Sequence, residues 1–390
     1  MQETRFDWKR TIRLNIVVLK ILGLWPPGDE ICGCTFYTLY EILNLLFLQI
    51  VVIVFQTVNL FLNIDDLKVV TGTIFVLLME MLAPTKCYTI IKNTRILKQL
   101  MATINDDLFQ PRNSQQLTLV QPNINAWRKT VATFWFFTLG WLLFLILYPI
   151  FDKTANESPL PFLAWYPYSI KASPLYELSY FHQIISVSTM SMVHINIDSL
   201  IAALNMYIGA QFDILCDNLR NFYDSGTDSP TDAEEKLKNC ISHHKKILKF
   251  AEYTNEFYNW LIFQEFFVGG ISIGLSMFQM TVVVPFSNEF HSFMSYSTAV
   301  SVQVFMYCWF GNEIELKSSK LPYAIFESDW TSLPPKIKKE LIIFFIRVQQ
   351  PLKMSAFGLF YLSLETFVKI LRTSWSYFAL LRQINSPKNN

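Results

Sequence analysis

Residues 131–151 read VATFWFFTLGWLLFLILYPIF, a run without a charged side chain. The hydrocarbon core of a bilayer is about 30 Å thick, and roughly 20 apolar residues of α-helix cross it. This run is apolar on every side rather than along one stripe, which argues against a surface helix of a soluble bundle. The stretch therefore predicts a transmembrane helix.

Six further apolar stretches accompany it, and each is long enough to cross a bilayer. The chain is 52% hydrophobic and 16% charged, whereas a soluble domain usually carries about 25% charged residues. We therefore expect an all-α integral membrane protein with seven transmembrane helices. The predicted spans are 37–60, 69–91, 131–151, 178–208, 261–285, 290–311 and 355–380.

The distribution of positive charge predicts the orientation. Most of the 32 Lys and Arg residues fall in the N-terminal segment and in the loops after the second, fourth and sixth spans. Basic loops stay in the cytoplasm, so the N-terminus is expected inside and the C-terminus outside. A glycosylation sequon at Asn156 falls in the predicted outer loop. All six cysteines fall on the inner side, where free thiols are expected.

Four regions follow from this topology. Residues 1–36 form a cytoplasmic segment with an interfacial helix over Thr11–Trp25, and 37–311 hold helices 1–6 with their inner loops. Residues 312–354 form an intracellular anchor region, and 355–390 form a pore-lining helix 7 with a short outer tail. Helical periodicity at 231–260, beginning with a capping box at Thr231, and at 336–350 predicts packed inner helices, which hints at oligomerisation. Pro351 is expected to split helix 7 into an inner and a crossing piece.

Enzymatic motifs are weak. Gly270-Ile271-Ser272-Ile273-Gly274 matches a nucleophile elbow, but it lies in an apolar span, where small residues ease helix packing. His243-His244 has no accompanying metal-ligand pattern. The sequence predicts no enzyme, no cofactor and no metal site, and the net charge of +1 gives no sign of nucleic-acid binding.

Polar side chains inside the spans are the better functional leads, because they are costly in lipid. Glu80 and Asp198 are expected toward the inner ends, paired with Lys86 or water, while His182 and His194 face either a cavity or a neighbouring helix. The last span carries an unusual polar load, including Gln383, which favours a pore lining. Leu380 and Ile384, one turn apart near its outer end, are typical of an apolar gate.

The outer halves of four spans are rich in aromatic and sulfur side chains. An apolar pocket with a few polar groups suits a small volatile or lipid-like ligand, and ordinary helix packing is the alternative. The residues that share helical faces are Phe75 and Met79, then Phe137, Gly140, Phe144 and Tyr148, and finally Phe293 and Tyr296.

Several motifs resemble the insect odorant receptor family. They are LGLWP at 22–26, YCWFGNE at 307–313, RVQQP at 347–351, LSLETF at 362–367 and SWSYFALL at 374–381. The resemblance spans the chain, and its specific motifs are concentrated in the last 85 residues.

The resemblance implies an odorant-gated, non-selective cation channel of four subunits in the plasma membrane of olfactory neurons. Helix 7 would line the pore with a gate at Leu380, Gln383 and Ile384. The odorant would bind between helices 2, 3, 4 and 6, near Phe75, Met79, Phe137, Gly140, Phe144, Tyr148, Met190 and Tyr296. The short loop at 211–258 and Arg382 are more similar to an odorant-tuned subunit than to the co-receptor, so a heterotetramer with the co-receptor is implied. A gustatory receptor, a G-protein-coupled receptor and a secondary transporter are the alternatives.

Overall fold

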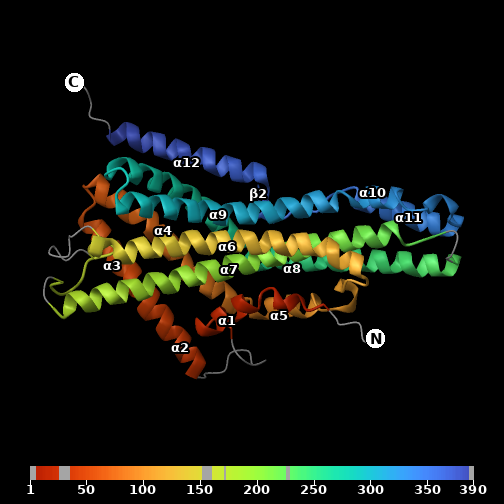
Figure 1. Ribbon diagram of the computed structural model, residues 1–390, viewed down its shortest axis with the longest axis horizontal. Coiled ribbons are helices and arrows are strands. Elements are labelled where there is room, and N and C mark those ends of the chain that lie inside the picture. The colour runs from red at the N-terminus through yellow and green to blue at the C-terminus, as the bar shows by residue number, and fades with distance from the viewer. Residues whose placement is uncertain (1–5, 26–35, 152–159, 171–172, 225–228, 386–390) are drawn as a thin grey trace.

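The computed structural model describes residues 6–25, 36–151, 160–170, 173–224 and 229–385. Long helices lie side by side along the longest axis of the molecule, with α12 at one edge and α1, α2 and α5 on the opposite side (Figure 1). The helices are α1 (Arg13–Ile21), α2 (Phe36–Leu45), α3 (Val51–Leu62), α4 (Leu67–Lys92), α5 (Thr94–Thr103), α6 (Ser114–Phe151), α7 (Leu175–Arg220), α8 (Pro230–Val282), α9 (Asn288–Ser318), α10 (Leu321–Phe326), α11 (Pro335–Val348) and α12 (Leu364–Asn385).

The apolar spans form helices, as predicted. Within the described residues, five helical stretches are long and apolar enough to cross a membrane: Phe36–Leu62, Val69–Lys92, Ser114–Leu147, Leu175–Arg220 and Pro230–Val282. The first is continuous through a π-helical turn at Leu46–Ile50. The remaining predicted spans, 290–311 and 355–380, fall on α9 and α12, which carry more polar side chains.

Two helices extend far beyond the predicted spans. α7 has 46 residues and α8 has 53, so the inner part of each continues without a break from the membrane-spanning part. The capping box that starts α8 uses Ser229 and Asp232 rather than Thr231. The Asp232 N–H donates to Ser229 Oγ at 3.2 Å, and Pro230 takes the first helical turn. The predicted capping box at Thr231 was therefore placed wrongly.

Helix 7 is split, as expected, but the crossing piece begins later than residue 355. The strands β1 (Ser355–Ala356) and β2 (Phe360–Tyr361) form a short hairpin between α11 and α12. Phe357 and Gly358 at its turn have φ of 52° and 68°, in the left-handed region that a right-handed helix cannot include. α12 starts after Ser363, whose Oγ accepts from the Thr366 N–H at 3.3 Å.

The N-terminal helix lies against the bundle through one face. Trp8 is fully buried, and its indole N–H donates to the Phe109 carbonyl at 3.2 Å. Asn15 in α1 donates to the Asn196 carbonyl of α7 at 3.2 Å. The opposite face of α1 exposes Leu14 and Ile21. This arrangement matches the predicted amphipathic helix, with an apolar outer face available to lipid.

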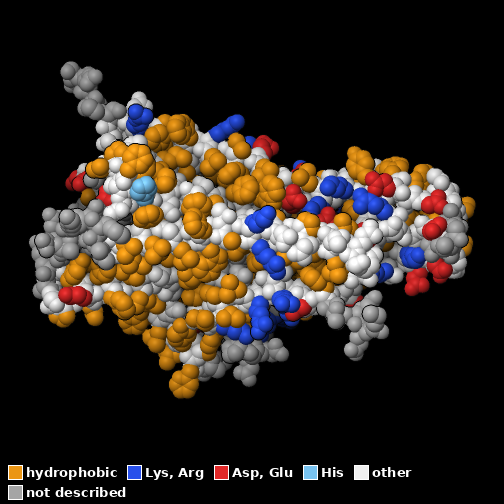
Figure 2. Space-filling view, in the orientation of Figure 1, with side chains coloured by type: hydrophobic (Ala, Val, Ile, Leu, Met, Phe, Trp, Pro, Cys, Tyr) orange, Lys and Arg blue, Asp and Glu red, His pale blue; other side chains and the backbone are white. Residues whose placement is uncertain are grey.

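The surface divides into two regions along the long axis. Hydrophobic side chains gather over the part that contains α2 and α3, and charged side chains are more frequent toward the end formed by α10 and α11 (Figure 2). An apolar outer surface beside a charged end is expected of a protein partly embedded in lipid. The four cysteines in the described residues, Cys87, Cys216, Cys240 and Cys308, are free and buried. Asn156 and the other two cysteines lie outside the described residues.

Candidate functional site

A cavity of about 60 Å³ lies between α4, α6, α7 and α9. Four helices supply its wall: Val76, Met79 and Glu80 from α4; Phe134, Thr138 and Trp141 from α6; Val187, Met190, Ser191, His194 and Ile195 from α7; and Tyr296, Ala299, Val300 and Gln303 from α9. Most of these side chains are apolar or aromatic, with a few polar groups among them. Small-molecule sites commonly have this composition, although they are usually larger, about 300–1,000 Å³.

Three of the predicted pocket residues line this cavity, namely Met79, Met190 and Tyr296. Phe75 lies directly behind Tyr296. Its ring meets that of Tyr296 edge to face at 4.9 Å between centroids, and its carbonyl accepts from the Tyr296 hydroxyl at 2.7 Å. Phe75 therefore fixes the position of a lining side chain without reaching the cavity itself.

The predicted residues of α6 occupy a different side of that helix. The Phe137 carbonyl accepts from Ser295 Oγ, Gly140 lies against the same hydroxyl, and Phe144 stacks on His291 at 5.9 Å. The Tyr148 side chain lies outside the described residues. Each helical position turns the side chain by 100°, so Phe134, Thr138 and Trp141 line the cavity instead. Sequence periodicity missed them because α6 is apolar on most of its surface.

Glu80 brings a carboxyl group to this wall and is only 4% exposed. Its Oε2 accepts from the Gln56 side-chain N–H of α3 at 2.7 Å, while Oε1 has no hydrogen-bond partner. Of the two expected partners, Lys86 or water, Lys86 does not pair with Glu80, because it contacts Asp198, Glu265 and His194 instead. The hydroxyl of Thr138 also lacks a partner. The cavity wall therefore includes two unsatisfied polar groups, one on α4 and one on α6.

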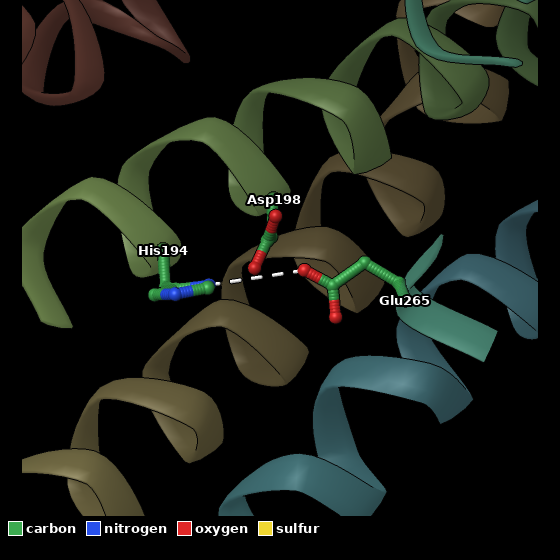
Figure 3. A group of neighbouring side chains, drawn as sticks. All are labelled: His194, Asp198 and Glu265. Carbon is green, nitrogen blue, oxygen red and sulfur yellow. Dashed lines mark ion pairs between the residues drawn. The ribbon is translucent and has the colours of Figure 1, made fainter. Parts of the chain in front are cut away.

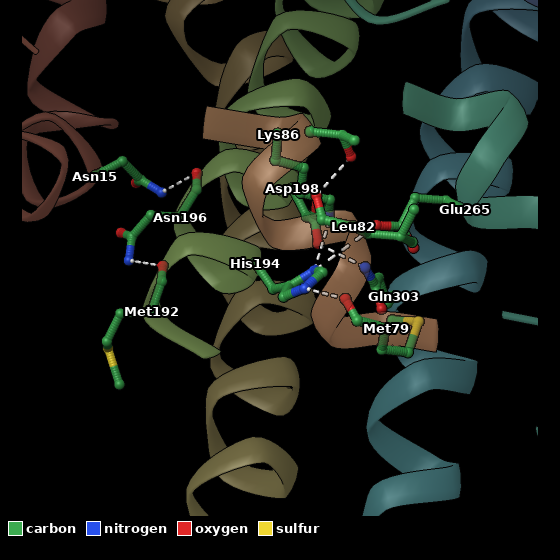
Figure 4. Close-up of polar contacts among 11 residues, drawn as sticks. Asn15, Met79, Leu82, Lys86, Met192, His194, Asn196, Asp198, Glu265 and Gln303 are labelled. Atoms are coloured by element: carbon green, nitrogen blue, oxygen red, sulfur yellow. Dashed lines mark hydrogen bonds and ion pairs between the residues drawn. The ribbon is translucent and has the colours of Figure 1, made fainter. Parts of the chain in front are cut away.

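Beside the cavity, Lys86 joins α4 to α7 and α8 through a buried charge cluster (Figure 4). Its Nζ lies 2.6 Å from Asp198 Oδ1 and also pairs with Glu265, and all three side chains are at most 1% exposed. The Gln303 amide of α9 donates to Asp198 Oδ2 at 2.6 Å. The expected pairing of Asp198 with Lys86 is confirmed. These bonds connect four membrane helices at one level.

His194 belongs to both the cavity wall and the charge cluster. Its Nδ1 lies 2.8 Å from Lys86 Nζ, and its Nε2 lies 3.0 Å from the Met79 carbonyl oxygen. Since an ammonium group can only donate, Nδ1 accepts and Nε2–H donates, which defines a neutral imidazole. Figure 3 shows the ring directed toward Glu265, at 3.8 Å. A neutral ring makes this a close approach rather than an ion pair.

The atoms of His194, Asp198 and Glu265 are close enough together to ligate a metal ion. The Lys86 ammonium, however, contacts all three of these side chains. It takes the place that a bound cation would need, so the donor set fits an internal lysine rather than a metal.

The contact between α8 and α12 explains the Gly-x-Ser-x-Gly pattern. A Cβ on Gly274 would lie 2.8 Å from the Ser374 backbone oxygen, and Ser374 Oγ donates to the Gly270 carbonyl at 2.8 Å. Ser272 faces away, donating to the Phe75 carbonyl at 2.9 Å. Small residues thus let two helices approach closely, as expected for packing within a membrane.

Among the residues that the structure describes, only one face of α12 is covered by other elements. Thr366, Ser374 and Phe378 are buried along that face. The predicted gate residues lie on the open face, where Leu380 is 56% exposed, Ile384 is 62% exposed, and Gln383 is also exposed. Several polar residues of α12 share this exposure, including Arg372, Thr373 and the ion-paired Glu365 and Lys369. A membrane helix with an uncovered polar face requires either another subunit or water beside it.

The remaining histidines make structural contacts. His182 lies 2.8 Å from the Phe47 carbonyl oxygen, which belongs to the π-helical turn. His243 contacts Gln211 at 2.9 Å, and the ring of His244 meets Phe344 edge to face. His243 and His244 therefore contact different neighbours and form no common site.

Known proteins share both the sequence pattern and the fold. A family model described as 7tm Odorant receptor matches residues 66–375. The chain belongs to this family. Among its relatives, Odorant receptor 46a, isoform A, of Drosophila melanogaster is 23% identical over 370 residues, covering 94% of this chain and 96% of that protein. Odorant receptor Or1 of Anopheles gambiae is 23% identical and covers 98% of this chain and 97% of its own length.

This odorant receptor also has the fold of a solved insect olfactory receptor. The structure of OR5 from Machilis hrabei in complex with eugenol superposes with a TM-score of 0.85 at 17% identity, covering 97% of this chain and 99% of that one. A second structure of OR5 from Machilis hrabei gives a TM-score of 0.84 at 16% identity. The agreement over nearly the whole length identifies the seven-helix receptor fold. The family and the five long apolar helices place the protein in a membrane.

Proposed function

We propose that this odorant receptor is an odorant-tuned subunit of a ligand-gated cation channel in the plasma membrane of olfactory neurons. Two observations together carry the proposal. They are an apolar cavity between α4, α6, α7 and α9 and a polar face on α12 that the described part of the chain leaves uncovered. The first suits a small volatile ligand and the second suits a pore shared between subunits. The solved relative bound to eugenol supports the ligand class.

In this mechanism, the odorant acts by binding one conformation more tightly than another. A cavity of about 60 Å³ is small for a molecule of several carbon atoms, so binding requires the surrounding helices to move apart. Only a difference in affinity between the closed and open conformations shifts their populations. α9 contributes to the cavity wall, and both α8 and α9 contact α12, so displacement in the bundle reaches the gate at Leu380, Gln383 and Ile384.

We further propose that the pore is completed by the insect odorant co-receptor in a heterotetramer. The exposed apolar residues of α11, Ile342, Ile343 and Ile346, provide a surface for contact between intracellular anchors. The charge distribution that keeps the N-terminus inside disfavours a G-protein-coupled receptor, whose orientation is the reverse.

Voltage-clamp recording tests the proposal directly. Cells expressing this chain with the co-receptor are expected to give odorant-evoked cation currents that neither subunit gives alone at the same ligand concentrations. Silence with both subunits at the cell surface across a broad odorant panel would refute it. Current from this chain alone would refute the requirement for a co-receptor.

A cavity-filling substitution tests the location of the site. Ala299→Leu adds volume at a lining position that is 6% exposed, and we expect at least about a tenfold loss of odorant sensitivity from steric exclusion. Ala132→Leu is the matched control because Ala132 is exposed on α6 outside the cavity wall. Equal dose responses for the two variants, at equal surface expression, would show that the odorant binds elsewhere.

A further inference from the structure

We propose that this cavity selects odorants that carry a hydroxyl group, so that small alcohols and phenols are its ligand class. The inference rests on the proposed function, because it assigns chemistry to the same cavity. It follows from two buried polar groups that the fold leaves without partners.

Glu80 supplies the hydrogen-bond acceptor. The side chain lies in the middle of α4, is 4% exposed and lines the cavity. The side-chain N–H of Gln56 donates to Glu80 Oε2 at 2.7 Å, and Oε1 has no hydrogen-bond partner. A buried polar atom of this kind is costly when it is left unpaired. A carboxyl group keeps acceptor capacity in either protonation state, so Glu80 can receive a hydrogen bond from a ligand.

Thr138 supplies a hydrogen-bond donor. A threonine inside a helix commonly donates to the carbonyl four residues earlier. Thr130 and Thr133 on the same helix do so, to Ala126 and Lys129, at 2.9 Å each. Thr138 is 7% exposed and makes no such bond, although it lines the cavity. Its hydroxyl proton therefore remains available to a ligand oxygen.

Three other polar side chains of the wall, those of His194, Gln303 and Tyr296, are already engaged, and Tyr296 donates to the Phe75 carbonyl. Both ring nitrogens of His194 have partners, in Lys86 and the Met79 carbonyl. The amide nitrogen of Gln303 donates to Asp198. Binding a polar ligand at these positions would require breaking hydrogen bonds that hold the helices together. Glu80 Oε1 and the Thr138 hydroxyl can bind a ligand without breaking any hydrogen bond.

A hydroxyl group matches this pair because it donates one hydrogen bond and accepts another. It would donate to Glu80 Oε1 and accept from Thr138, with its apolar remainder against Trp141, Met190 and Tyr296. An ether or a ketone only accepts, so it would leave Oε1 of an ionised Glu80 unpaired. A protonated amine only donates, so it offers nothing to the Thr138 proton. The alcohol alone among these groups satisfies both side chains.

Pairs of isomers test this selectivity without changing molecular size. Cells expressing the receptor with the co-receptor are exposed to 1-hexanol and methyl pentyl ether, and to 4-ethylphenol and 4-methylanisole, with hexylamine as a further arm. The hydroxyl compound of each pair is expected to be about tenfold more potent, the effect of roughly one net hydrogen bond.

Two variants assign the preference to the two side chains. The double variant Gln56→Leu with Glu80→Leu removes both partners of the existing bond, and we expect the advantage of the hydroxyl isomer to fall below about threefold. Thr138→Val weakens responses to both isomers, because either oxygen can accept from Thr138. Thr133→Val is the matched control on α6, where the hydroxyl is bonded to the helix backbone, and no change is expected.

Several outcomes would overturn the proposal. They are equal potency of the isomers at the unmodified receptor, a preference that survives in the double variant, or a hexylamine response stronger than that to 1-hexanol. If the double variant does not reach the cell surface, the isomer ratio of the unmodified receptor and the parallel loss in Thr138→Val decide the question. Absence of current with every odorant of a broad panel would instead refute the proposed function, which separates the two failures.

Discussion

Replacing Lys86 by methionine would keep most of the volume of the side chain while removing its charge. Asp198 and Glu265 would then lie buried with no cation between them, since both pair with Lys86 at present. Asp198 would retain the Gln303 amide as a hydrogen-bond donor. We expect this single change to be among the most destabilising substitutions in the bundle.

The magnitude follows from the geometry. At 2.6 Å and an effective dielectric constant of about 20, one ion pair is worth about 6 kcal/mol of attraction. Desolvation of the ions opposes this attraction by several kcal/mol for each ion, so the intact cluster contributes little net stability. Removing only the cation leaves the desolvation of two carboxylates uncompensated, and such losses measure about 3–5 kcal/mol. Native proteins are stable by only about 5–15 kcal/mol, so a large fraction would be lost.

The assay is the heat stability of detergent-solubilised receptor carrying a fluorescent fusion, read from the monodisperse peak in size-exclusion chromatography. Lys86→Met is expected to lower both the yield and the melting midpoint. Lys336→Met is the matched control, because Lys336 pairs with Glu234 at 3.0 Å while it is 70% exposed. Exposed pairs contribute little to stability, so no measurable shift is expected there.

A triple variant separates the loss of charge balance from the loss of packing. Lys86→Met combined with Asp198→Asn and Glu265→Gln removes every formal charge of the cluster, and it should recover most of the lost stability. A melting midpoint for Lys86→Met equal to that of the unmodified receptor would refute the reasoning. A triple variant no more stable than Lys86→Met alone would also refute the reasoning, because the loss of stability would then arise from altered packing rather than from unpaired charge.

Two further predictions concern the helix contact at α12 and the intracellular end of α8. Gly274→Ala places a methyl group 2.8 Å from the Ser374 backbone oxygen, so α12 must move and the odorant-evoked current should fall. Gly270→Ala is the matched control and should be tolerated, because its methyl group would have its nearest neighbour at 3.5 Å. Equal currents from the two variants would contradict the packing argument. Burial lowers the pKa of His243 to about 3 and that of His244 to about 4, below the value of about 6.5 in an unfolded chain. The unfolded state therefore binds more protons below pH 6.5, and stability should fall as the pH drops toward 4, by about 1.4 kcal/mol per pH unit for each histidine. His244→Phe should make the melting midpoint less sensitive to pH between 7 and 5, and an unchanged dependence would count against this assignment.

The sequence by itself determined the membrane architecture. Hydropathy and basic loops act locally against the bilayer, so seven spans and their orientation follow without knowledge of tertiary contacts. The split of helix 7 could be read from Pro351 for the same reason. The start of the crossing piece at Leu364 could not be predicted in this way. The hairpin before it depends on the backbone angles of Phe357 and Gly358, which the hydropathy of the sequence does not reveal.

Tertiary structure decided the site. In lipid both faces of α6 are apolar, so no periodicity distinguishes the side that carries Phe137 from the side that carries Thr138, although the two are separated by a rotation of 100°. The full set of partners of Lys86 and Glu80 could not be predicted from the sequence either. Asp198 lies 112 positions from Lys86 along the chain, and Gln56 belongs to another helix. Which polar groups meet, and which remain unpaired beside the cavity, depends on how the helices rotate and shift against each other, and that is fixed only when they pack.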